Sequence, residues 1–79
     1  MSIQIEERAK KVMSNVFGIE PHLISEKTSP DTLEKWNSLG HMNLIIALEE
    51  EFKIQFSDTQ IIEMMNYPLM ICTLREIVK

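Results

Sequence analysis

Apolar side chains recur every three or four positions over the first seventeen residues. This spacing places them along one face of an α-helix. Gly18 follows the last of them, and glycine is common just beyond the end of a helix. The pattern predicts a helix from about residue 2 to residue 17. Its buried face is expected to carry Ile5, Ala9, Val12, Met13 and Val16.

A second helix is predicted from Ser38 to about Glu51, where helix-forming residues dominate. Leu44, Leu48 and Phe52 form its inward stripe. Further apolar residues fall on its other faces, namely Leu39, Met42 and Ile46. A helix that is apolar over most of its circumference is buried on more than one side. In so short a chain, this predicts an apolar face that is open to a partner.

Residues 18–37, between these two helices, show no sustained hydrophobic period. They contain two prolines and scattered serine and threonine, a composition typical of a loop. Residues 21–24 fit a single helical turn with proline in its first position. We expect Leu33 and Trp36 to attach the end of the loop to the core. Loops of this length in a small domain are often functional.

The C-terminal third carries the patterns of shorter elements. Residues 52–56 alternate apolar and polar, but a lone strand has nothing to pair with, so we expect an extended connector. Ser57 and Gln60 have the spacing of a capping box. This spacing predicts a third helix from about Asp58 to Met65.

The last helix is predicted from a second capping-box spacing, between Thr73 and Glu76. It is expected to cover residues 73–78, after a break at residues 66–68, which include a proline. The predicted fold class is therefore all-α. It is a small four-helix bundle, with three main helices, a short one and a long loop between helices one and two. The whole chain, residues 1–79, is expected to form one domain.

Charge and hydropathy narrow the range of partners. The net charge is −4 and the isoelectric point is about 5.0, which argues against nucleic acid and against an anionic membrane surface. A basic protein partner fits the sign better. The longest apolar run, residues 44–48, is far too short to cross a bilayer. We expect a cytoplasmic monomer.

Few residues offer catalytic or metal-binding chemistry. The chain has two histidines and one cysteine, without metal-ligand spacing among them. Cys72 lies among apolar residues and is expected to be a small buried side chain. Ser38 and His41 are neighbours on a helix, but the sequence supplies neither an oxyanion hole nor a dry site for an orienting acid. We therefore expect a protein that is not an enzyme.

The segment Trp36-Asn37-Ser38-Leu39-Gly40-His41 stands at the junction of the long loop and the second helix. From local chemistry alone, either Ser38 or Asn37 is expected to cap that helix. The segment also resembles the modification site of acyl carrier proteins. The resemblance extends to the helix end Ala47-Leu48-Glu49-Glu50-Glu51-Phe52-Lys53-Ile54 and to the order of the elements over nearly the whole chain.

The resemblance implies that a phosphopantetheinyl transferase attaches 4′-phosphopantetheine from coenzyme A to Ser38. The thiol of that arm would carry acyl groups as thioesters to partner enzymes. These partners would be acyl ligases, synthases or acyltransferases with basic docking patches. The implied docking residues are Asn37, Leu39, Met42, Glu49, Glu50 and Glu51. The residues expected to line the acyl chain, if they do not simply pack in the core, are Leu44, Ile45, Ile54, Ile61, Ile62 and Met65.

The chain departs from the family pattern at two places. Asn37 stands where the family usually has aspartate, which removes a carboxylate used in transferase and metal recognition. Gly40, His41 and Asn43 replace acids found in carriers of fatty-acid synthesis, which suggests a specialised pathway. His41 is either a contact of the phosphodiester or an ordinary surface histidine. The alternative function is an unmodified helical module that binds a basic partner.

Overall fold

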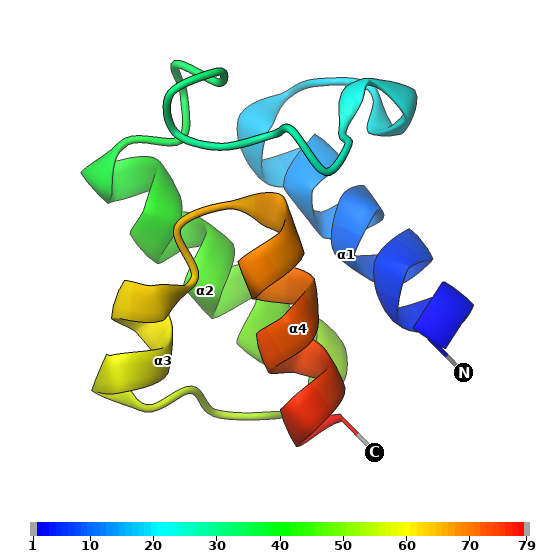
Figure 1. Ribbon diagram of the computed structural model, residues 1–79, viewed down its shortest axis with the longest axis vertical. Coiled ribbons are helices and arrows are strands. Elements are labelled where there is room, and N and C mark those ends of the chain that lie inside the picture. The colour runs from blue at the N-terminus through cyan, green and yellow to red at the C-terminus, as the bar shows by residue number, and fades with distance from the viewer. Residues whose placement is uncertain (1, 79) are drawn as a thin grey trace.

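The chain folds into an all-α bundle with a long loop crossing one end (Figure 1). The computed structural model describes residues 2–78, and no β-strand occurs in that range. The elements are α1 (Ser2–Phe17), a 3₁₀ turn η1 (Pro21–Leu23), α2 (Ser38–Phe52), α3 (Asp58–Glu63) and α4 (Tyr67–Ile77). The predicted fold class is confirmed, and α1 and α2 match their predicted ranges to within a residue.

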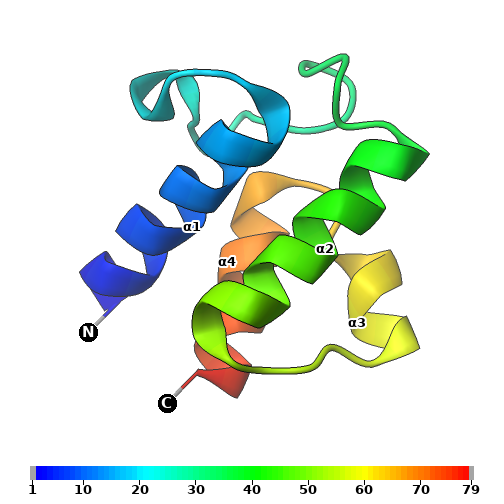
Figure 2. The same ribbon diagram turned by 180° about the vertical axis from the view of Figure 1, so that it is seen from behind.

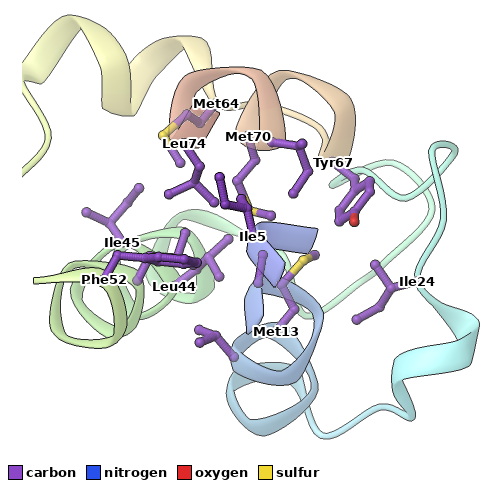
Figure 3. Close-up of a cluster of buried hydrophobic side chains, with 14 of the residues drawn as sticks. Ile5, Met13, Ile24, Leu44, Ile45, Phe52, Met64, Tyr67, Met70 and Leu74 are labelled. Atoms are coloured by element: carbon purple, nitrogen blue, oxygen red, sulfur yellow. The ribbon is translucent and has the colours of Figure 1, made fainter. Parts of the chain in front are cut away.

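The core lies between α1, α2 and α4. Helix α1 packs against both α2 and α4, and the short α3 packs against α4 (Figures 1 and 2). Figure 3 shows side chains from these three helices meeting in one cluster, with Ile24 of the loop at its edge. The largest fully buried side chains are Trp36, Phe17, Met13, Leu44, Ile45, Leu48, Met64, Met70 and Leu74. No helix in residues 2–78 is both long and apolar enough to cross a bilayer.

Helix α3 starts as predicted but ends earlier. The hydroxyl of Ser57 accepts from the Gln60 N–H (3.2 Å), and the Gln60 side chain accepts from the Ser57 N–H (2.9 Å). This is the expected capping box. The helix stops at Glu63 instead of Met65 because Met64 leaves the helical conformation and is fully buried. A connector is present as expected but displaced by one residue from the predicted range 52–56, because Phe52 still belongs to α2 and residues 53–57 lead to α3.

Helix α4 corrects the prediction for the C-terminus. It begins at Tyr67, six residues before the predicted start, because Asn66 caps it by accepting from the Leu69 N–H at 2.9 Å. Pro68 lies in the first turn, where proline is tolerated because no intrahelical N–H bond is lost. Thr73 is inside the helix, and its hydroxyl donates to the Leu69 carbonyl at 3.0 Å. Cys72 is exposed on α4, so the expectation of a buried cysteine was wrong.

Polar contacts attach α4 to α1 and to the long loop. The Tyr67 hydroxyl donates to Glu6 Oε1 (3.3 Å), and Arg75 pairs with Glu6 Oε2 (2.8 Å). Burial and the neighbouring Glu6 carboxylate raise the pKa of Tyr67 well above its ordinary value, so this hydroxyl remains a neutral donor. The Tyr67 N–H donates to the Thr28 carbonyl at 2.9 Å. The loop is thereby held over the end of the bundle, where it leads into Ser38.

Candidate functional site

Asn37 and Ser38, two adjacent polar residues at the start of α2, have different roles. The side chain of Asn37 accepts from the Gly40 N–H at 2.9 Å and caps the helix. Ser38 is the first residue of α2 and is exposed. No hydrogen bond within residues 2–78 involves its hydroxyl. Of the two expected cap residues, Asn37 is therefore the one that caps, and the exposed Ser38 hydroxyl has no partner in that range.

An apolar cleft of about 700 Å³ lies beside Ser38. Three parts of the chain surround it: the end of the long loop, the first turns of α2, and α3 with the segment after it. Most of the surface exposed in the cleft is apolar, although three of its nine lining residues are polar. The lining residues are Pro30, Trp36, Asn37, Ser38, His41, Met42, Ile61, Ile62 and Met65. An apolar cleft with a few polar groups in its lining is the usual form of a site for a small molecule.

His41 connects the walls of this cleft. The indole Nε1–H of Trp36 donates to His41 Nδ1 at 2.9 Å, and His41 Nε2 lies 2.8 Å from the carbonyl oxygen of Ile61. Because an indole N–H can only donate, Nδ1 is the acceptor and Nε2 carries the proton that binds Ile61. His41 was expected to be either a contact of the phosphodiester or an ordinary surface histidine, and it is neither, because it joins two walls of the cleft. Both ring nitrogens have protein partners, which leaves neither for a phosphodiester.

Exposed apolar side chains occur on α2, on α3 and in the turn after α3, and three of them, Met42, Ile62 and Met65, line the cleft beside Ser38. Leu39 is 72% exposed and Ile62 is 70% exposed, and Met42, Ile46 and Met65 are each about half exposed. These five residues of α2, α3 and the turn after α3 are called the apolar face below. Monomeric proteins seldom leave such groups together without a binding role. The predicted open face of α2 is present, and it includes two of the residues expected to dock partners, Leu39 and Met42.

The three glutamates at the end of α2 are not equivalent. Glu49 Oε2 accepts from the Phe56 N–H at 2.9 Å and so fixes the connector to α3. Glu51 Oε2 pairs with Arg8 Nε at 2.8 Å, and the Arg8 guanidinium lies 4.4 Å from the centroid of the Phe52 ring. Glu50 is exposed and has no hydrogen bond or ion pair within residues 2–78. Of these expected docking acids, two already have partners inside the protein.

Replacing Glu49 with alanine is expected to lower the free energy of unfolding by about 1–2 kcal/mol, because a charge-assisted bond to the Phe56 N–H is lost. Glu50→Ala is the matched control. It removes the same charge from the same helix end but no internal contact, so its effect should stay within about 0.5 kcal/mol. Urea denaturation measures both. Equal losses in the two variants would show that the Glu49 contact contributes nothing.

The residues expected to line an acyl chain divide into two groups. Ile61, Ile62 and Met65 line the cleft. Leu44 and Ile45 are buried in the core, and Ile54 is partly buried against it, and none of these three reaches the cleft. For this second group, ordinary core packing accounts for the side chains.

Sequence reasoning missed the loop side of the cleft. Trp36 and Pro30 form part of its lining, although Trp36 was expected only to anchor the loop. Trp36 is 1% exposed, and its ring also packs on Phe17 with ring centroids 5.7 Å apart. A tryptophan two residues before the candidate serine was the signal that could have revealed this wall.

No model of a known protein family matches the chain. Within residues 2–78, no three His, Cys, Asp or Glu side chains gather as a metal site would require. The chemistry open to this site follows from its geometry: a free serine hydroxyl, a helix N-terminus, an apolar cleft and an apolar face.

Proposed function

We propose that this protein is an acyl carrier protein that receives 4′-phosphopantetheine on Ser38. The observation that supports this most is the free hydroxyl of Ser38. It is exposed at the first residue of α2, while the neighbouring Asn37 performs the capping. A serine that caps a helix has its oxygen engaged by backbone N–H groups. Ser38 is released from that role, and a transferase can reach it.

The residues around Ser38 suit the group that it would carry. A phosphodiester on Ser38 would stand at the N-terminus of α2, where the helix dipole favours negative charge by ~0.3–1 kcal/mol. The adjoining cleft is lined by apolar groups and suits the apolar part of a cargo. When attached, phosphopantetheine supplies a thiol that holds an acyl group as a thioester. The chain itself supplies the attachment oxygen, the helix end and the cleft.

The same geometry argues against a serine hydrolase. A catalytic serine needs a histidine nitrogen that can accept its proton. His41 is the nearest histidine along α2, and its accepting nitrogen, Nδ1, is occupied by the Trp36 indole N–H. Its other nitrogen donates to the Ile61 carbonyl. Neither nitrogen is free to activate Ser38.

Partners are expected to dock mainly on the apolar face. Glu49 and Glu51 have internal partners, which leaves Glu50 as the free acid of the three. We therefore infer enzyme partners that present apolar surface to α2, with at most a few basic residues at the rim. This supports a carrier of a specialised pathway, because the first turns of α2 offer Gly40, His41 and Asn43 instead of acids.

The test is an intact mass after incubation with coenzyme A and a promiscuous phosphopantetheinyl transferase. We expect a gain of one phosphopantetheine in the wild type and none in Ser38→Ala. Ser25→Ala is the control, because it removes a different exposed serine that does not line the cleft, and it should still gain the group. No gain with several transferases would refute the carrier and favour an unmodified interaction module that uses the apolar face.

A further inference from the structure

Helix α3 forms one wall of the cleft but makes few contacts with the rest of the bundle. It has only six residues, and none of them is buried. It packs against α4, and the cleft separates it from the first turns of α2. Within residues 2–78, one side-chain hydrogen bond joins α2 to α3, and it runs from His41 Nε2 to the Ile61 carbonyl.

The Ile61 carbonyl needs this donor. The last four carbonyls of a helix have no partner from within the helix. In a longer helix the Met65 N–H would take the Ile61 carbonyl, but here it donates to the Glu63 carbonyl at 2.9 Å. His41 supplies the missing donor from across the cleft. Trp36 keeps the Nε2–H of His41 available as this donor. The indole N–H of Trp36 binds Nδ1, so the imidazole proton is on Nε2.

We infer that His41 is a positioning residue that tethers α3 to α2 and thereby sets the size of the apolar group that the cleft beside Ser38 admits. The walls that the tether joins carry Met42 on one side and Ile61, Ile62 and Met65 on the other. The tether keeps these two walls close together, and without it they could move apart and widen the cleft. The part of this inference that concerns cargo rests on the proposed carrier function, whereas the tether itself does not.

Three substitutions separate the two hydrogen bonds of His41. A glutamine amide reaches about as far as Nε2, so His41→Gln keeps a donor for Ile61. An asparagine amide reaches about as far as Nδ1, so His41→Asn keeps an acceptor for Trp36 but loses the tether. His41→Leu loses both bonds. The comparison of Gln with Asn is decisive, because both variants are polar and each retains one of the two bonds.

The first measurement uses the unmodified protein. Amide hydrogen exchange is followed at Ile61 and Met64, whose N–H groups donate to the Ser57 carbonyl (3.0 Å) and the Gln60 carbonyl (3.1 Å) at the two ends of α3. We expect exchange about two- to twelvefold faster in His41→Asn and His41→Leu, the range that the loss of one hydrogen bond permits. His41→Gln should exchange at the wild-type rate, and α1 amides should be unchanged in all three. Equal exchange in the Gln and Asn variants would overturn the tether.

The second measurement loads straight-chain acyl-phosphopantetheine of increasing length onto Ser38 from acyl-coenzyme A. The rate of thioester cleavage by hydroxylamine then reports which lengths are sheltered. The longest sheltered chain should increase in His41→Asn and His41→Leu and stay the same in His41→Gln. An unchanged length limit in all variants would overturn the size selection. If the wild type cannot be loaded, the carrier function and the size selection both fail, and the exchange data still decide the tether.

Discussion

Trp36→Ala is expected to lower the free energy of unfolding by about 3–5 kcal/mol, the range for truncating a buried aromatic side chain. The indole is 1% exposed, packs on Phe17 and donates to His41 Nδ1. A chain of this length has a total stability of roughly 4–12 kcal/mol at ordinary values per residue. The variant should therefore be close to unfolding at room temperature, as measured by urea denaturation.

Trp36→Phe is the matched control for the tryptophan. It keeps an aromatic ring against Phe17 but removes the donor to His41, so it should lose less stability than the alanine variant. If Trp36→Ala retains the stability of the wild type, then the end of the long loop is not attached to the core as described, and the cleft lacks a fixed wall.

Gly40→Ala is expected to destabilise the protein by about 1–3 kcal/mol, although alanine is the better helix former. A Cβ at this position would overlap the Lys35 carbonyl oxygen and lie 3.2 Å from Phe17 Cε1. The first of these atoms is backbone, so the loop itself would have to move. The glycine is required because the loop end passes directly over the first turn of α2.

Asn43→Ala is the control for helix propensity. Asn43 is exposed on the same helix, so alanine there should raise stability by a few tenths of a kcal/mol. In urea denaturation, the free energy of unfolding should fall in Gly40→Ala and rise in Asn43→Ala. A Gly40→Ala protein that is as stable as Asn43→Ala would contradict the close approach of the loop.

Local patterns predicted the elements whose signals lie within a few residues of one another. The three-to-four spacing located α1 and α2, and the Ser57–Gln60 spacing located the start of α3. The predicted start of α4 is wrong because a proline such as Pro68 is also typical of a break between helices. Proline also fits the first turn of a helix, and only the Asn66 cap distinguishes the two situations.

The site depends on contacts between segments that are distant in sequence, and these could not be predicted. His41 and Ile61 are 20 residues apart, and Arg8 and Glu51 are 43 apart. Nothing in the local pattern indicates either pair. The resemblance singled out Ser38 but could not tell whether its hydroxyl was free. Asn37 and Ser38 are equally good caps, and only the backbone geometry determines which one is used.

The central claim, that Ser38 is the attachment point, is tested most directly by locating the modification. Trypsin cleaves after Lys35 and Lys53, and the peptide of residues 36–53 contains Ser38 as its only hydroxyl or thiol side chain. The exposed Cys72 can form a mixed disulfide with coenzyme A, so the reaction is analysed after reduction. We predict one phosphopantetheine on the peptide of residues 36–53 and none elsewhere. Its absence from that peptide, or its presence on another one, would contradict the account.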